Sequence, residues 1–248
     1  MTSERTTERP VPGIGRELTV PEALACALRI LAAEGWQENL SGHITWADDD
    51  GGMWVNPWGL WWSEVRASDI MSVSLDGSIL SGKWDVTPVV FIHTELHRAR
   101  PDARIIVHNH PYAATVLACL GVEPVISHQN ACLFDDDLAF IHEYDGAVES
   151  AEAGRWLADQ VGKATGTLLV NHGAIITAES IGAACYRAVT FERMCRMTLD
   201  ALQAGRELLP LPTAIRADLK ALLNRVTPDA YWDGAVRQLL AREPEVLD

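Results

Sequence analysis

Two histidines one residue apart follow a strand-like run, and a third histidine follows a similar run later in the chain. His108 and His110 come after residues 105–107, and His172 comes after residues 167–170. Because a β-strand points residues i and i+2 to the same face, we expect the first two imidazoles to converge on one point. Three imidazole ligands leave metal positions open, as catalytic rather than structural sites do. The spacing therefore predicts a metal site.

The chemistry of imidazole does not select one element for this site. Neutral imidazoles bind zinc, and also manganese, cobalt and iron. We expect one divalent metal per chain, with zinc ahead of the others. Gly173 follows His172 and is predicted to permit the tight turn that aims the third imidazole out of its strand end. A lone histidine at a strand end is more often a satisfied polar residue, so the prediction depends on the set of three.

Composition indicates a soluble protein with one core. The chain has 248 residues, of which 48% are hydrophobic and 22% charged, enough for a single globular domain. Its ends show no signal peptide and no run long enough to span a membrane, so we expect a cytoplasmic protein with no membrane association. The five cysteines have no C-x-x-C spacing and are predicted to be free. A net charge of −14 argues against nucleic-acid binding.

The pattern of turns and helices divides the chain as follows. Residues 1–16 are expected to be a disordered or loosely attached tail, residues 17–225 a single domain, and residues 226–248 a C-terminal tail near a neighbouring subunit. Hairpins are predicted around Asp48–Gly52 and Asp76–Gly77. Further strand-like runs are 105–107, 124–127, 138–142 and 167–170, and helices are predicted over 20–34, 88–98, 112–120, 149–161 and 180–202.

Strands that come in adjacent pairs, with helices between the pairs, indicate the fold class. The fold is predicted to be α/β, with a mostly antiparallel sheet covered by helices on both faces. A doubly wound dinucleotide-binding fold is excluded, because Gly13-Ile14-Gly15 is too isolated to be a nucleotide loop.

Four segments, in this order and spacing, resemble the class II aldolase/adducin family. They are Asn39–Ile44, Asn56–Leu60, His93 through the Arg-Pro-Asp run to His110, and Asn171–Gly173. The resemblance covers roughly residues 20 to 205. It implies a three-layer α/β/α fold, homotetramers with active sites at subunit interfaces, and metal ligands at His108, His110 and His172. Family members include sugar-phosphate aldolases, decarboxylases of aromatic or pyridine carboxylates, and the non-catalytic adducin head.

The sequence departs from the family's aldolases where they carry a catalytic glutamate and two serines that hold the substrate phosphate. These places read Thr87, Pro88 and Val89 here. Aldol cleavage and dehydration need a base that Val89 cannot supply. Decarboxylation needs none, since its leaving group is already an ionised carboxylate. It needs an acid that protonates the carbanion left behind.

We therefore predict a metal-dependent lyase acting through a metal-stabilised enolate or phenolate. The favoured reaction is decarboxylation of a hydroxylated aromatic, pyridine or ring-cleavage carboxylic acid, so the expected partner is a small-molecule carboxylate. One alternative is an aldolase acting on an unphosphorylated hydroxy-keto acid, and another is a non-catalytic adducin-like interaction protein. A non-haem iron oxygenase is disfavoured, because no carboxylate stands at a ligand position.

Candidate residues for substrate and proton follow from the same comparison. The resemblance implies substrate contacts in the loops that hold Asn39, Ser41 and Gly59, although Asn39 and Gly59 also suit plain turns. Trp58 belongs to a tryptophan-rich stretch, Trp54 to Trp62, that predicts either a flat apolar wall for a ring or a packing surface. Candidate proton donors are Tyr144 and Tyr231, which resemble tyrosines that family aldolases take from a neighbouring subunit, and His93, which could instead orient the substrate.

Overall fold

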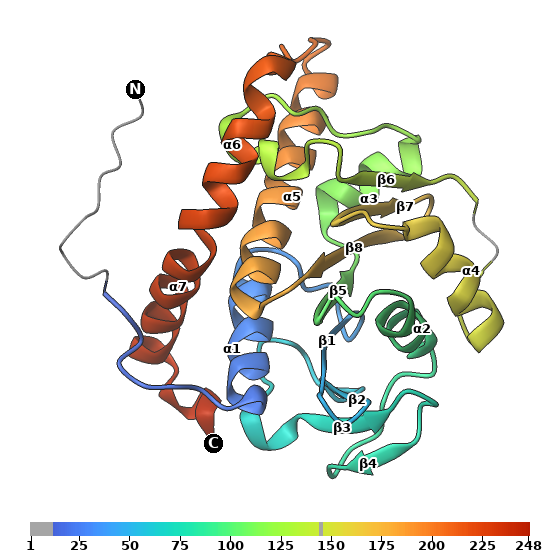
Figure 1. The fold of residues 1–248 in the computed structure, drawn as a ribbon, viewed down its shortest axis with the longest axis vertical. Coiled ribbons are helices and arrows are strands. Elements are labelled where there is room, and N and C mark those ends of the chain that lie inside the picture. Colours follow the sequence, from blue (N-terminus) through green and yellow to red (C-terminus); the bar gives the residue numbers. More distant parts are fainter. Residues whose placement is uncertain (1–11, 144–145) are drawn as a thin grey trace.

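The computed structural model describes residues 12–143 and 146–248, and one eight-stranded sheet forms its centre (Figure 1). The strand order is β4-β3-β2-β1-β5-β8-β7-β6, and every neighbouring pair is antiparallel except β6 and β7. The strands are β1 His43–Ala47, β2 Gly52–Val55, β3 Met71–Ser74, β4 Ile79–Ser81, β5 Ile105–Asn109, β6 Leu138–Ile141, β7 Gly166–Leu169 and β8 Gly173–Ala178. The expected mostly antiparallel sheet is confirmed.

Helices cover both faces of this sheet (Figure 1). The side chains of β5 alternate between two cores: Ile105 and Val107 pack with α1, α3 and α5, whereas Ile106 packs with α2 and α4. This alternation follows from the two-residue period of a strand, and it confirms the three-layer α/β/α architecture. The helices are α1 Val20–Ala33, α2 Phe91–Ala99, α3 Tyr112–Leu120, α4 Ala151–Val161, α5 Ile181–Gln203, α6 Thr213–Val226 and α7 Pro228–Arg242, with short 3-10 turns η1 Ala67–Asp69, η2 Gln129–Phe134 and η3 Pro244–Leu247.

Two local predictions were wrong. Residues 124–127 form no strand, because the Val125 amide donates to the Thr198 hydroxyl at 2.9 Å and the Ile126 carbonyl accepts from the Leu211 amide at 2.8 Å. These partners belong to α5 and the loop after it, so the backbone has no place in a strand ladder. The helix expected from residue 88 begins only at Phe91, after a turn at residues 88–90.

The C-terminal segment belongs to the packed body of this chain. Helix α7 packs against α1 and α5, and η3 contacts α1 as well. Trp232, Val236, Leu239 and Val246 are buried there. Residues 226–248 are thus not a separate tail, although their position near a neighbouring subunit stays a prediction. The N-terminal tail predicted for residues 1–16 lies mostly outside the described residues.

Arg29 ties the end of the chain to the first helix. Its side chain is 7% exposed, and its guanidinium donates to the Val65 carbonyl at 3.0 Å and the Glu64 carbonyl at 3.2 Å. It also pairs with Glu243 at 2.8 Å and Glu245 at 3.0 Å. One cation therefore joins α1, the loop after β2 and the C-terminal turn.

Replacing Arg29 by methionine is expected to lower the free energy of unfolding by about 2 kcal/mol, because two backbone carbonyls lose their donor and two carboxylates lose their partner. Urea unfolding followed by circular dichroism measures the change. Arg16→Met is the matched control, because Arg16 pairs with Glu22 on the surface with 48% of its side chain exposed. Exposed pairs contribute less than about 1 kcal/mol. Equal losses in both variants would contradict the anchoring role.

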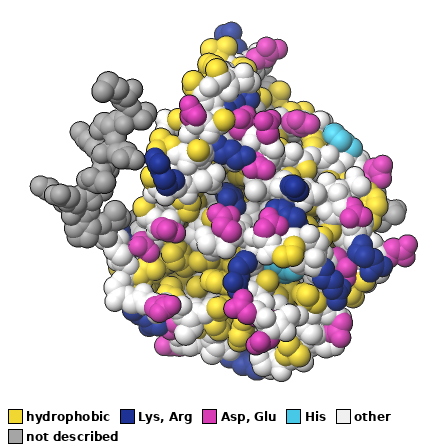
Figure 2. All heavy atoms as spheres, viewed as in Figure 1, with side chains coloured by type: hydrophobic (Ala, Val, Ile, Leu, Met, Phe, Trp, Pro, Cys, Tyr) yellow, Lys and Arg dark blue, Asp and Glu magenta, His cyan; other side chains and the backbone are white. Residues whose placement is uncertain are grey.

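On the face shown in Figure 2, acidic and basic side chains of the described residues are interspersed rather than segregated. No helix within residues 12–143 and 146–248 is long and apolar enough to cross a membrane. The cysteines are free, as predicted, and all are buried except Cys119.

Candidate metal centre

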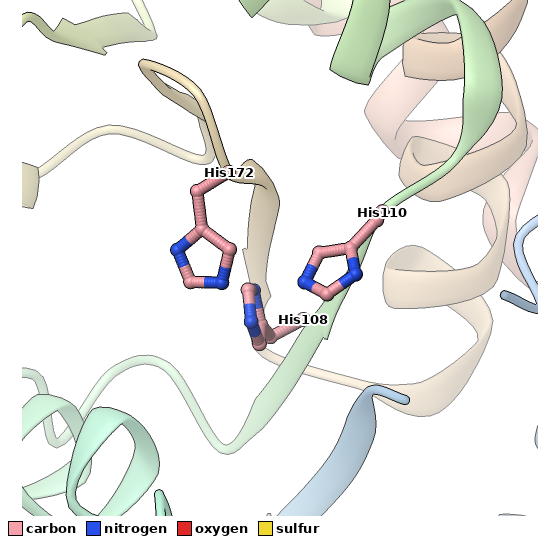
Figure 3. A group of neighbouring side chains, drawn as sticks. All are labelled: His108, His110 and His172. Atoms are coloured by element: carbon pink, nitrogen blue, oxygen red, sulfur yellow. The ribbon is translucent and has the colours of Figure 1, made fainter. Parts of the chain in front are cut away.

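The structure brings the predicted histidines together at one end of the central strands. His108 and His110 come from β5 and the residue after its end, and His172 comes from the β7–β8 turn (Figure 3). One ligand nitrogen of each lies within 4.8 Å of the other two. Ring centroids are separated by 4.8 Å for His108 and His172, 5.0 Å for His110 and His172, and 5.4 Å for His108 and His110. Three nitrogens at such spacing can converge on one cation.

The turn that presents His172 differs from the one expected. Asn171 has φ 55°, so this residue, and not Gly173, takes the left-handed conformation. Asparagine tolerates that region better than most residues with a side chain. The sequence prediction that Gly173 makes the turn was therefore wrong.

Gly173 is required for a different reason, which is close approach. A Cβ atom built on Gly173 would lie 2.6 Å from the Asn109 carbonyl oxygen and 2.7 Å from Cδ2 of His110. Only glycine lets β8 lie this close to the strand that carries the other two imidazoles. Gly173 thus sets the distance between His110 and His172, the residue that precedes it in the chain.

Hydrogen bonds direct the bare nitrogens of two rings toward the common space. Nδ1 of His108 lies 3.0 Å from the Ala174 carbonyl, which can only accept, so Nδ1 carries the proton and Nε2 is bare. Nδ1 of His110 lies 2.5 Å from the Glu38 carboxylate, and its Nε2 is buried without a partner. Metal-binding histidines in proteins commonly donate their second N–H to a carbonyl or a carboxylate. The donor set thus fits a divalent cation.

Burial keeps the rings of His108 and His172 neutral. Desolvation holds the pKa of His108 well below its usual value, and it lowers the pKa of His172 to about 4, with His110 nearby adding to both shifts. A neutral imidazole is the form that binds a metal. At neutral pH the rings of His108 and His172 therefore need no deprotonation before a cation enters.

Glu38 was missed by the sequence analysis, although it stands next to Asn39 in the family-like segment. Replacing Glu38 by glutamine is expected to weaken metal affinity about tenfold, because the amide accepts more weakly from His110 than a carboxylate does. Titration of metal-free protein with zinc measures the affinity. Glu34→Gln, an exposed change at the end of α1, is the control and should leave the affinity unchanged. An unchanged affinity in Glu38→Gln would show that Glu38 does not support His110.

Further histidines lie beside the triad. The ring of His43 lies 6.1 Å from that of His108 and 5.4 Å from that of His93, and the rings of His93 and His108 are 6.4 Å apart. No pattern in the sequence indicates a partner for His43. In the structure it faces His108 across the β1–β5 pair. Burial lowers the pKa of His43 to about 3 and that of His93 well below its usual value.

Two buried groups hold the loop that carries Glu38. Asn56 accepts from the Ile44 amide at 2.9 Å and donates to the Gly42 carbonyl at 3.3 Å, and the Trp62 indole donates to the same carbonyl at 3.2 Å. Trp62 is therefore a packing residue rather than part of a substrate wall. Of the clustered tryptophans, Trp58 and Trp61 are the exposed ones.

The other substrate candidates occupy two loops. Asn39 and Ser41 lie in the turn next to Glu38, where Asn39 has φ 49° and the Ser41 amide donates to the Glu38 carbonyl at 2.9 Å. Trp58 and Gly59 are exposed on the loop after β2. Trp58 lines a surface cavity of about 550 Å³ with Thr87 and Pro88, and no histidine lines that cavity. The first loop thus adjoins the triad through Glu38, and the second belongs to a separate hollow.

Of the predicted proton donors, His93 lies beside the triad and Tyr231 lies elsewhere in the described part of the chain. Tyr231 is on α7, where its ring packs 5.5 Å from that of Tyr186 and burial raises the pKa of its phenol. Within the described residues no contact joins Tyr231 to the triad. Tyr144 lies outside the described residues. A tyrosine from a neighbouring subunit remains the prediction for both.

A cavity of about 640 Å³ opens beside His172. Its apolar lining includes Ile141, Val148, Trp156 and Leu169, and its acidic lining includes Glu143 and Glu152. Small-molecule sites commonly have such volumes and such a largely apolar wall. The carboxylates disfavour an anionic group among them, so an acidic ligand would place its anion at the histidine end.

Fold and site together define an α/β protein with a three-histidine centre at the ends of central strands. The chain belongs to the class II aldolase and adducin family, because the family model for the class II aldolase and adducin N-terminal domain matches residues 22–199. The resemblance of the four sequence segments is confirmed.

Proteins of three kinds are similar to this chain. An adducin-related protein of Schizosaccharomyces pombe is 36% identical over 185 residues, which cover 68% of this chain but only 54% of that protein. The chain thus spans about half the length of this relative. A 3,4-dihydroxyphthalate decarboxylase of Arthrobacter keyseri is 30% identical over 230 residues, covering 85% of this chain and 90% of the other. The solved structure of an L-fuculose 1-phosphate aldolase from Glaciozyma antarctica superposes with a TM-score of 0.81 at 23% identity, covering 95% and 98% of the two chains.

Proposed function

We propose that this protein is a divalent-metal-dependent decarboxylase of a hydroxylated aromatic, pyridine or ring-cleavage carboxylic acid. The observation that carries the proposal is a complete three-histidine centre in a chain that has Val89 where family aldolases have their catalytic base. The relative named a 3,4-dihydroxyphthalate decarboxylase supports it, since that protein matches this chain over nearly the full length of both. Family membership supports a carbon–carbon lyase in general.

His108, His110 and His172 would hold the metal. When bound there, a divalent cation withdraws electron density from an oxygen next to the carboxylate and so stabilises the charge that develops as the bond breaks. Glu38 and the Ala174 carbonyl keep the two donor rings in place. Zinc is the first candidate, and manganese, cobalt and iron are the others.

The chain's own residues supply orientation and a dry wall. The cavity beside His172 offers apolar contact to a ring through Trp156 and Leu169, which excludes water from the face they cover. Asn39 and Ser41 stand in the loop next to Glu38, where their polar groups can orient a substrate. Tyr144 and Tyr231 are the proposed proton donors, reaching a neighbouring subunit's site in a homotetramer.

Two other functions make different demands on the chain. An aldolase for an unphosphorylated hydroxy-keto acid needs a base, and at Val89 the side chain offers none. An adducin-like interaction protein needs no metal, yet His108 and His110 hold bare nitrogens within a cluster of three histidines. The geometry therefore favours a lyase over an interaction module, and decarboxylation over aldol cleavage.

The test is a metal analysis of the purified protein followed by a carbon dioxide release assay. The substrates are hydroxyphthalates, pyridine dicarboxylates and carboxylated ring-cleavage products. About one metal per chain with carbon dioxide release supports the proposal. Metal without carbon dioxide, together with cleavage of a hydroxy-keto acid, would establish the aldolase. Absence of metal binding would establish the interaction protein.

A further inference from the structure

Next to the triad, four groups form a chain of hydrogen bonds that ends at a backbone carbonyl, a group that can only accept. Nδ1 of His97 lies 3.0 Å from the Ala103 carbonyl, Nε2 of His97 lies 2.8 Å from the Thr45 hydroxyl, and the same hydroxyl lies 2.7 Å from Nδ1 of His93. Thr45 and His93 are fully buried, and His97 is 6% exposed. Because water does not compete for these groups, each hydrogen bond in the chain has one defined donor and one defined acceptor.

The fixed end sets the direction of every bond in the chain. A carbonyl only accepts, so Nδ1 of His97 carries a proton, and Nε2 of the neutral ring must accept from the Thr45 hydroxyl. The Thr45 oxygen has then used its one proton, so it accepts from Nδ1 of His93. Burial supports neutral rings, since it lowers the pKa of His97 to about 4.

The free end of the chain is Nε2 of His93, which this order leaves without a proton. That atom is buried and has no hydrogen-bond partner among residues 12–143 and 146–248, and the same holds for Nδ1 of His43. The rings of His43 and His93 lie 5.4 Å apart, and both neighbour His108. Buried polar atoms rarely remain unpaired, so Nε2 of His93 is expected to accept from a donor group that binds beside it.

We propose that His93 accepts a hydrogen bond from a hydroxyl group of the substrate, and that Thr45 and His97 fix His93 as the acceptor. The inference rests on the proposed function in one respect, which is that a small carboxylic acid binds at the triad. It adds a specificity: the substrate carries a hydroxyl rather than a methoxy or keto oxygen beside His93. It also excludes His93 as a proton donor.

The first test concerns the ring proton of His93 without any substrate. A long-range proton–nitrogen correlation spectrum of protein labelled with heavy nitrogen in its histidines separates protonated from bare ring nitrogens. We expect Nδ1 of His93 to be protonated and Nε2 bare, with the signals assigned through their loss in His93→Phe. A proton on Nε2 of His93 in the unmodified protein overturns the proposal.

Thr45 provides the matched pair of variants. Thr45→Ser keeps the hydroxyl and should keep the His93 pattern, whereas Thr45→Val removes the hydroxyl at equal size and should give a mixture of both tautomers. A purely structural threonine would affect stability and leave the pattern unchanged. The same pattern in Thr45→Val as in the unmodified protein therefore overturns the relay.

The second test measures binding rather than turnover. Calorimetry compares salicylate with the dihydroxybenzoates that keep its 2-hydroxyl group. Each of these isomers adds one hydroxyl at a different ring position. We expect at least one isomer to bind roughly tenfold more tightly than salicylate, and His93→Phe to abolish this gain. No gain with any isomer, or an equal gain in His93→Phe, overturns the proposal. A gain without carbon dioxide release would leave the His93 role intact and refute only the decarboxylase.

Discussion

His108→Ala is expected to remove both the metal and the activity. The residue is buried near the end of β5, its Nδ1 donates to the Ala174 carbonyl, and one of its ring nitrogens is among the three that lie within 4.8 Å of one another. Two histidines alone leave the cation weakly held. We expect metal content to fall below about a tenth of an ion per chain, and the rate of carbon dioxide release to fall roughly a thousandfold, equal to about 4 kcal/mol of transition-state stabilisation.

The control for this variant is His142→Ala. His142 is an exposed histidine after β6 that stacks on Phe140 at 4.3 Å between ring centroids. It should retain both metal and rate. Circular dichroism and urea unfolding establish that His108→Ala still folds, so that loss of metal is not loss of structure. Retention of a full metal complement in His108→Ala would show that the cation binds elsewhere.

Gly173→Ala is expected to have the second-largest effect, although it changes no ligand. The added methyl group would meet the Asn109 carbonyl oxygen at 2.6 Å and His110 Cδ2 at 2.7 Å. A backbone carbonyl cannot move without shifting β5, so the strain should displace His110 and separate the three rings. We expect a loss of at least about tenfold in metal affinity and about 2 kcal/mol in stability.

Gly166→Ala separates the local effect from general destabilisation. A Cβ atom there would meet the Phe134 ring at 2.9 Å, in the core below α5 and away from the histidines. It should lose a similar amount of stability and keep its metal affinity. Zinc titration and urea unfolding of both variants give the comparison. Equal metal affinity in the two would mean that the spacing of β5 and β8 does not set the position of His110.

The site depends on the middle layer of the fold more than on any single helix. β5 lies between β1 and β8, so His108 has His43 on one side and the strand that follows His172 on the other. Helix α2 covers the same face and adds His93 and His97. A strand order in which β5 were an edge strand would leave these imidazoles in water.

Much of the fold could be predicted from the sequence, since it depends on neighbours along the chain. Pro111 and Gly121 bracket Tyr112–Leu120, and that helix has the expected bounds. Asp76-Gly77 makes the predicted turn between β3 and β4. The H-x-H spacing and the strand before it likewise sufficed to choose the triad, because a strand's two-residue period is a local property.

Only the tertiary structure decided what surrounds the triad. Glu38 meets His110 across 72 residues, and Thr45 meets His93 across 48 and His97 across 52. No periodicity encodes such contacts, because they arise when strands and helices from different parts of the chain pack at one sheet. The requirement for glycine at Gly173 also arises from packing. A side chain is excluded there because β5 lies against β8. Local sequence patterns thus determined which histidines form the triad. Tertiary packing determined which ring nitrogens of His108 and His110 carry no proton.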